Sequence, residues 1–163
     1  YKINKVGWYG NINVTNKTNN LRKKLFVIGN NNSDLYDFHH VDSNNPNNFK
    51  CIIDIIDDYS ILIDVEGGGY SARLKYLLFS NKPLIIVDRP YKEFFFEYLI
   101  PYIHYIPVKR DLSDLIEKTT WILNNYNESL IIAKNALDYA KIYLSEEYVY
   151  KHIFNIINIL NKI

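Results

Sequence analysis

The sequence of 163 residues contains no methionine and a single cysteine, Cys51. One cysteine cannot form a disulfide within the chain, so a disulfide-stabilised fold is excluded. The lack of methionine, with tyrosine at position 1, indicates that the sequence does not begin at a translation start. We therefore expect a fragment or a trimmed domain, from which targeting signals could have been removed.

Long apolar runs and an excess of charge of one sign are also missing. No apolar run approaches the roughly 20 residues of a membrane span, and no signal peptide is recognisable. The formal net charge of +1 gives no reason to expect broad attraction to nucleic acid or to a membrane surface. With 48% hydrophobic and 23% charged residues, the composition is globular, and the length fits one domain with its own core.

Asparagine, isoleucine, lysine and tyrosine are abundant instead. AT-rich codons favour these residues, so the bias is compatible with a protist or large-DNA-virus genome. The asparagine-rich segments 30–32 and 44–48 are interpreted as polar loops. Accidents of the same bias explain the four glycosylation sequons, which lie at Asn13, Asn16, Asn31 and Asn127.

Apolar patterns predict strands that alternate with helices. Strands are expected at residues 5–9, 25–28, 34–41, 61–65, 83–87 and 104–108. A helical turn is expected at 21–24, and helices at 71–80, 91–99, 111–124, 128–143 and after Ser145, a plausible N-cap. Residues 49–56 fit either a short helix or a strand. Such alternation predicts an α/β fold, with a Rossmann-like parallel sheet and right-handed crossovers.

The last two helices have no strand after them, so they are expected to pack across one face or to return to another domain. We therefore divide the chain into a Rossmann-like unit, residues 1–126, and closing helices of the same domain, residues 127–163. In the last helix the residues expected to be buried are Val149, Ile153, Ile156, Ile157 and Leu160.

Residues 61–78 are the most informative stretch. An apolar run ends at Val65, Glu66 and three glycines follow, and the leucines after them have helical spacing. Glycines let a backbone approach a ligand closely, and a helix that follows would direct its free N–H groups and positive dipole end at the turn. Arg73 would add a planar, permanently charged group that suits phosphate oxygens. The stretch predicts a phosphate or diphosphate site.

Each of these residues has a structural alternative. The glycines could form a plain tight turn, Arg73 a surface salt bridge, and Arg22 part of a solvated basic face. Glu66 could hold a sugar hydroxyl or accept N–H bonds of the turn. Glu93 could hold a ribose or complement a helix dipole.

Other chemically suggestive residues favour structural interpretations. Adjacent histidines on a strand point to opposite faces, so His39 and His40 are not expected to bind one metal ion. Cys51 lies beside isoleucines and is expected in the core. Structural roles are also expected of His104, Asp57, Asp58, Asp111, Asp114 and the three phenylalanines 94–96.

From residue 59 onward the sequence resembles the CAP10-like glycosyltransferases, glycosyltransferase family 90, which includes the protein O-glucosyltransferases (Rumi). The matching segments, in order and spacing, are IDVEG at 63–67, YSARLKYLL at 70–78, EFF at 93–95, Leu99, Pro101, HYIPV at 104–108 and DLSDL at 111–115. The segment WYGN at 8–11 and Arg22 resemble the family more loosely, and the loop 11–20 is longer than is usual there.

The resemblance implies the carboxyl-terminal, donor-binding half of a GT-B enzyme that transfers a sugar with inversion and without metal or other cofactor. The donor is a UDP-sugar such as UDP-glucose or UDP-xylose, and the acceptor a protein or glycan. The implied donor-binding residues are Asn11, Arg22, Glu66, Gly68, Gly69, Tyr70, Ser71, Ala72, Arg73 and Glu93. The general base is expected to be an aspartate in the amino-terminal half, which this sequence lacks.

Two other functions stay open at this stage. The chain could be a non-catalytic nucleotide-sugar-binding module, or a Rossmann scaffold without affinity for UDP, because fold does not guarantee function. Members of the family are often found in the secretory pathway. The sequence leaves the compartment undecided between that pathway, the cytoplasm and a large-DNA-virus setting.

Overall fold

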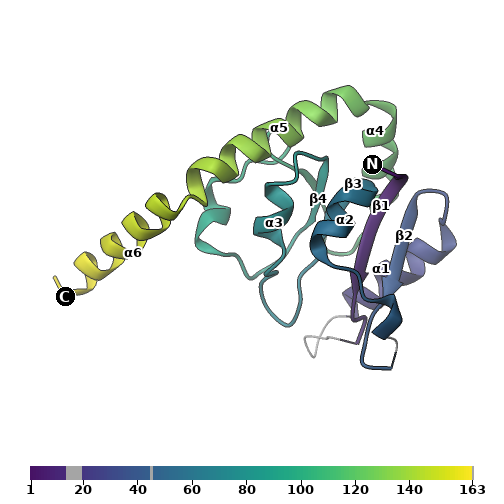
Figure 1. Ribbon diagram of the computed structural model, residues 1–163, viewed down its shortest axis with the longest axis horizontal. Coiled ribbons are helices and arrows are strands. Elements are labelled where there is room, and N and C mark those ends of the chain that lie inside the picture. Colours follow the sequence, from purple (N-terminus) through teal and green to yellow (C-terminus); the bar gives the residue numbers. More distant parts are fainter. Residues whose placement is uncertain (14–19, 45, 163) are drawn as a thin grey trace.

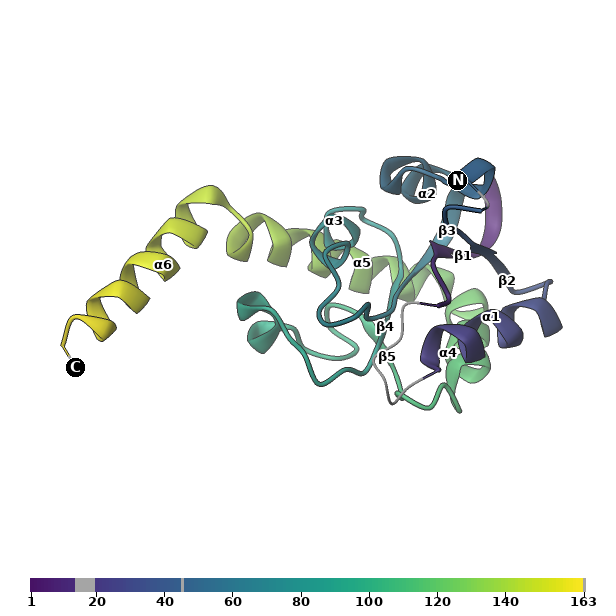
Figure 2. The same cartoon turned by 90° about the horizontal axis from the view of Figure 1, so that it is seen from below.

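The computed structural model describes residues 1–13, 20–44 and 46–162. The described chain forms one five-stranded sheet, flanked by helices on both faces (Figures 1 and 2). All neighbouring strands are parallel, and their order is β2-β1-β3-β4-β5. The parallel α/β sheet predicted from the sequence is therefore confirmed. Most of the loop predicted at 11–20 lies outside the described residues.

The strands are short, and the central ones are entirely buried. They are β1 (Ile3–Gly10), β2 (Tyr36–His40), β3 (Tyr59–Asp64), β4 (Leu84–Val87) and β5 (Ile106–Val108). The helices are α1 (Leu21–Asn31), α2 (Ile52–Asp58), α3 (Leu74–Leu78), α4 (Leu115–Asn124), α5 (Tyr126–Tyr143) and α6 (Glu146–Leu160), with 3₁₀ turns η1 (Pro46–Asn48) and η2 (Phe94–Tyr98). Unbroken apolar runs in β3 and β4 are typical of strands that are covered on both faces.

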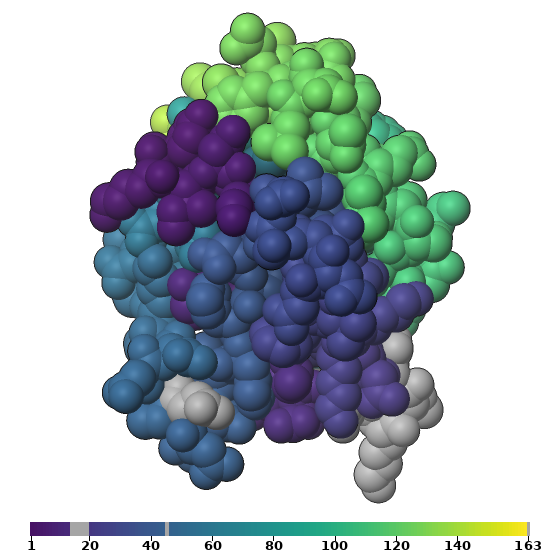
Figure 3. Space-filling view, turned by 90° about the vertical axis from the view of Figure 1, so that its right-hand side faces the viewer, coloured from purple at the N-terminus to yellow at the C-terminus, as the bar shows by residue number. Residues whose placement is uncertain are grey.

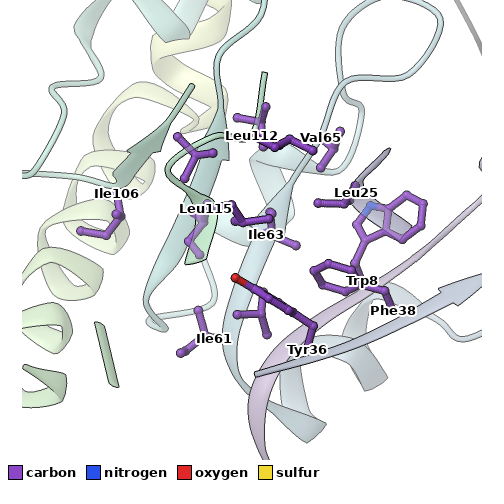
Figure 4. Close-up of a cluster of buried hydrophobic side chains, with 14 of the residues drawn as sticks. Trp8, Leu25, Tyr36, Phe38, Ile61, Ile63, Val65, Ile106, Leu112 and Leu115 are labelled. Atoms are coloured by element: carbon purple, nitrogen blue, oxygen red, sulfur yellow. The ribbon is translucent and has the colours of Figure 1, made fainter. Parts of the chain in front are cut away.

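Two hydrophobic clusters lie on opposite faces of the sheet. One joins the sheet to α1 and α4, with Trp8, Leu25, Ile63 and Leu115 among its members (Figure 4). The other joins the sheet to α2, α3, η2 and α5, around Leu62. In Figure 3, which views the β2 end, the blue residues of the α1–β2 region form the surface beneath the green residues of α4 and α5.

The strand predicted at 25–28 is wrong, because these residues belong to helix α1. Leu21, Leu25 and Gly29 are its buried residues, at a spacing of four, whereas Val27 is 55% exposed. Periodicity alone does not separate a short apolar run in a strand from the same run in a helix. Residues 49–56, left open between helix and strand, contain the start of helix α2.

Three helices are shorter than predicted. The helix expected at 71–80 is the five-residue α3, and the one expected at 91–99 is the 3₁₀ turn η2. The helix expected from residue 111 begins at Leu115, because Leu112 has a left-handed φ of 60° that interrupts helical geometry. Only the long α5 matches its predicted length closely.

Helix α6 projects away from the sheet (Figures 1 and 2) and contains no buried residue. Its predicted N-cap is confirmed, since the Ser145 hydroxyl accepts a hydrogen bond from the Tyr148 N–H at 3.2 Å. The prediction that α6 buries its apolar residues is wrong: Ile153 and Ile157, for example, are 47% and 48% exposed. No helix in the described parts of the chain has the length and apolarity needed to cross a membrane.

Candidate functional site

The candidate site lies where the carboxyl ends of β1 and β3 meet. From β1 the chain crosses to β2 on one side, and then returns to β3 on the other. In open parallel sheets, this switch point is where ligands bind. Asn11 directly follows β1, and the glycine turn 67–69 follows β3, so two segments that sequence reasoning selected lie at this edge.

Arg22 joins the two segments. Its Nε donates to the Glu66 carbonyl oxygen at 2.8 Å, and its Nη1 donates to the Asn11 carbonyl oxygen at 3.1 Å. The guanidinium also lies 5.7 Å from the ring centroid of Trp8, which is within cation–π range. The structure therefore brings Arg22, Asn11 and Glu66 together, and Arg22 is not on a separate basic surface.

Arg73 approaches the same tryptophan. Its Nη1 donates to the carbonyl oxygen of Tyr9 at 2.5 Å, and its guanidinium lies 5.9 Å from the Trp8 ring. Burial lowers the pKa of Arg73, and burial together with the charge of Arg73 lowers the pKa of Arg22 to about 10. Neither arginine forms an ion pair with a carboxylate in the described part of the chain. A bound anion would relieve this accumulation of positive charge.

The glycine turn is open to solvent. None of the described glycines has a positive φ, so the turn does not require their freedom to adopt left-handed conformations. A Cβ atom added at Gly68 or Gly69 would meet nothing within 4 Å, and one at Gly67 would lie 3.5 Å from Arg22 Nη2. Side chains at 68 and 69 would therefore occupy the space beside the turn, which a ligand approaching the backbone also needs.

Behind the turn, Ser71 belongs to a buried polar network. Its hydroxyl donates to Asp64 Oδ1 at 2.5 Å, and Asp64 Oδ2 lies 2.5 Å from Arg89 Nη1. Arg89 Nη2 also donates to the Asp64 carbonyl oxygen at 3.1 Å. All three residues are nearly inaccessible, so the Ser71 hydroxyl is directed into the protein. The network joins the carboxyl ends of β3 and β4.

The carboxylate of Glu66 has a partner that sequence reasoning missed. Arg110, in the loop after β5, donates to Glu66 Oε2 at 3.1 Å and to Oε1 at 2.5 Å. Glu66 is 4% exposed, whereas the side chain of Arg110 is 32% exposed. Among the described residues, the Glu66 carboxylate accepts its hydrogen bonds from Arg110 and not from N–H groups of the turn.

The other predicted residues lie around or beyond this group. Tyr70 and Ala72 are exposed beside the turn. Glu93 precedes η2 and lines a separate cavity of about 380 Å³ with Lys75 and Phe94; burial raises its pKa. Because α3 has five residues and begins at Leu74, the helix dipole expected to act on the turn is short.

Two cavities reach the site through its arginine side chains. One, of about 400 Å³, lies on the β1 side and is lined by Tyr9, Val41, Phe49 and Arg73 among others. The other, of about 570 Å³, lies beyond the ends of β4 and β5, and Arg110 is in its wall. Arg73, which the sequence analysis selected, and Arg110, which it missed, thus each line a cavity near the site.

The remaining candidates have structural contacts. His39 and His40 pair separately with Asp37 at 2.7 Å and Asp42 at 2.9 Å, and no group of three metal-ligating side chains occurs among the described residues. Cys51 is exposed rather than buried, which corrects the expectation of a core cysteine, because it precedes α2 at the rim of the 400 Å³ cavity.

Several known proteins are similar in sequence to part or most of this chain. Protein O-glucosyltransferase 3 of Homo sapiens is 33% identical over 99 residues, covering 61% of this chain and 20% of that protein. Protein O-glucosyltransferase 2 of Danio rerio is 36% identical over 92 residues, covering 56% and 18%. Protein 035R of Invertebrate iridescent virus 3 is 26% identical over 164 residues, covering 88% and 15%. The chain thus spans about a fifth or less of these relatives.

The solved structure of TarM has the same fold, with a TM-score of 0.66 at 10% identity over 95% of this chain and 35% of TarM. The predicted fold class, a Rossmann-like half of a GT-B glycosyltransferase, is confirmed. The sequence matches the family described as Glycosyl transferase family 90 over residues 2–163. This match covers nearly the whole sequence, and the chain therefore belongs to glycosyl transferase family 90.

Proposed function

We propose that this chain is the donor-binding part of an inverting, metal-independent glycosyltransferase that uses a UDP-sugar such as UDP-glucose or UDP-xylose. Family membership and the names of the O-glucosyltransferase relatives support sugar transfer. The observation that carries the proposal is the position of Arg22 and Arg73, two partly buried cations without a carboxylate partner among the described residues, beside an open glycine turn.

In this proposal the diphosphate of the donor lies against the glycine turn. Main-chain N–H groups of residues 68–70 donate to its oxygens, and the two arginines balance its charge. When the sugar is transferred, negative charge develops on the departing UDP. Preorganised positive groups stabilise such charge strongly, because they need not reorganise as the reaction proceeds.

The nucleoside would enter the 400 Å³ cavity on the β1 side. Arg73 lies in its wall, so a diphosphate held by Arg73 would direct the attached nucleoside there. The apolar side chains of Val41 and Ile52 and the exposed ring of Phe49 suit the faces of a flat base. Binding sites of this size commonly combine apolar walls with a few polar groups.

The acceptor and the general base would come from the remainder of the protein. The curated relatives are about five times longer than the segment they share with this chain, and an aspartate towards their amino-terminal side is the proposed base. We therefore expect the isolated chain to bind donor but to transfer sugar poorly.

A calorimetric titration with UDP, with ADP as the control, tests the proposal. Saturable binding of UDP that exceeds binding of ADP would support it and would justify a comparison of UDP-glucose with UDP-xylose. If the full-length protein also fails to bind UDP, the proposal is wrong and a scaffold role is favoured. Donor binding by the full-length protein without sugar transfer to any acceptor would favour a non-catalytic nucleotide-sugar-binding module.

A further inference from the structure

The segment at the centre of the site has few contacts of its own. Among the described residues, no main-chain hydrogen bond is formed by residues 67–70, and the first hydrogen-bonded turn begins at Ser71, whose carbonyl oxygen accepts from the Leu74 N–H at 3.2 Å. The conformation of the glycines must therefore be set at the two ends of the segment. Ser71 fixes one end through its bond to the buried carboxylate of Asp64.

Glu66 fixes the other end, and two arginines hold it from different elements. Arg22 of α1 binds its carbonyl oxygen, and Arg110 of the β5–α4 loop binds both oxygens of its carboxylate. A two-point contact between a guanidinium and a carboxylate fixes orientation as well as distance. The pair therefore fixes the direction in which the chain leaves Glu66 and enters the glycine turn.

The two partners of this ion pair differ in their exposure to solvent. Glu66 is 4% exposed and depends on Arg110 for the compensation of its charge, whereas about a third of the Arg110 side chain remains accessible. Removing Arg110 would leave a buried carboxylate unpaired, which is costly, and the backbone that carries it would have to move towards water. The segment beside Glu66 that is free to follow this movement is the glycine turn.

We infer that Arg110 is a positioning residue for ligand binding, acting through Glu66 on the glycine turn without itself being required to touch the ligand. This inference rests on the proposed function for the identity of the ligand, a nucleoside diphosphate. It assigns a role to a residue in a loop that lies 44 positions from Glu66 in the sequence.

The first test needs no ligand. Backbone amide order parameters of residues 67–70, measured by NMR relaxation, are compared in the wild type, in Arg110→Ala and in Lys109→Ala. Lys109 is a matched control, because it is the neighbouring cation of the same loop and lines the same cavity. We expect the order parameters of the turn to fall in Arg110→Ala alone, because the turn then loses the fixed orientation of Glu66. Equal order parameters in all three proteins would overturn the inference, whatever the ligand is.

The second test is a double-mutant cycle read by UDP titration in the folded proteins. If Arg110 acts through Glu66, Arg110→Ala should weaken UDP binding about tenfold in the wild type and less than twofold in the Glu66→Gln background. Arg110→Lys should recover part of the affinity, because lysine supplies the charge but not the two-point contact. The same tenfold loss in both backgrounds would mean a direct contact with UDP and would overturn the inference.

Shorter ligands separate positioning from general damage. Because the turn is proposed to hold the diphosphate, Arg110→Ala should weaken UDP binding but change uridine binding by less than twofold. Equal weakening for UDP and uridine would indicate a loss of structure instead. If the full-length wild type binds neither, the proposed function fails, and the order parameters still decide whether Arg110 positions the turn.

Discussion

At the scale of single residues, the contact between Arg73 and Trp8 is the main feature of this site. The guanidinium is fixed by one carbonyl oxygen, lies over an aromatic ring and forms no ion pair with a carboxylate among the described residues. Sequence reasoning selected Arg73 from its place after the glycines. It did not predict that Arg73 and Arg22 would both approach the Trp8 ring, because that arrangement depends on how α1 packs against the sheet.

Replacing Arg73 with alanine should weaken UDP binding by about 1.5–3 kcal/mol, the usual value of charge-assisted hydrogen bonds. Calorimetric titration of the folded variant measures the change. Lys75→Ala is the control, because Lys75 is a nearby cation that faces the separate cavity around Glu93. Unchanged affinity in Arg73→Ala would refute a contact with the diphosphate.

Gly68→Val should abolish UDP binding and leave the unfolding free energy within about 0.5 kcal/mol of the wild type. The valine would fill the open space beside the turn without meeting protein atoms. Gly29→Val is the contrasting variant, because its Cβ would lie 2.3 Å from the Phe38 ring and should destabilise the fold. Normal UDP binding by Gly68→Val would place the ligand elsewhere. Urea denaturation supplies the stability comparison.

At the scale of elements, the buried strands β3 and β4 and the final two helices followed from the sequence, whereas several of the shorter helical segments did not. The run at residues 25–28 suggested a strand because it is apolar, yet its place in α1 is determined by burial every fourth residue. Helix α3 and turn η2 both begin later and end earlier than the apolar patterns predicted. The pairing of Glu66 with Arg110 depends on the path of the β5–α4 loop, which no local pattern encodes.

The buried pair between Asp64 and Arg89 joins β3 to β4 beneath the site. Asp64→Asn should lower the unfolding free energy by about 3–5 kcal/mol, because it leaves the Arg89 guanidinium buried without its counter-charge. Urea denaturation measures the loss. The comparison is Asp138→Asn, which breaks a pair between Lys134 and Asp138 whose side chains are 57% and 51% exposed and should cost less than about 1 kcal/mol. Similar losses of unfolding free energy in both variants would contradict the expectation that the buried pair contributes more than the exposed pair.

At the scale of the whole molecule, α6 is the exception to an otherwise well-packed fold. Tyr150, Phe154 and Leu160 are more than 60% exposed, and the helix extends beyond the sheet and its other helices (Figure 2). Sequence periodicity correctly indicated an apolar face on this helix. It could not indicate whether that face packs against another part of the chain. An amphipathic pattern shows which side chains a helix tends to bury, but it does not show which surface will cover them.

A double substitution, Ile153→Gln with Ile157→Gln, should leave the unfolding free energy within about 0.5 kcal/mol of the wild type, because both side chains are about half exposed. It should also reduce concentration-dependent self-association, since exposed apolar faces promote association. Sedimentation velocity and urea denaturation measure the two effects. Ile122→Gln, at a position with no exposure, should cost about 3 kcal/mol or more. A comparable loss from the double substitution would mean that α6 packs in solution.

The open space at Gly68 and Gly69 has a consequence for descent within the family. Nothing in the described fold requires glycine at either position, so natural selection can retain these residues only through what binds beside them. In a lineage that stops using this ligand, mutations at 68 and 69 would accumulate as neutral changes, while glycines in crowded positions, such as Gly7 against the ring of Tyr59, would persist. A comparison of substitution rates at positions 68 and 69 with those at crowded glycines such as Gly7 would therefore indicate which descendants still use the site.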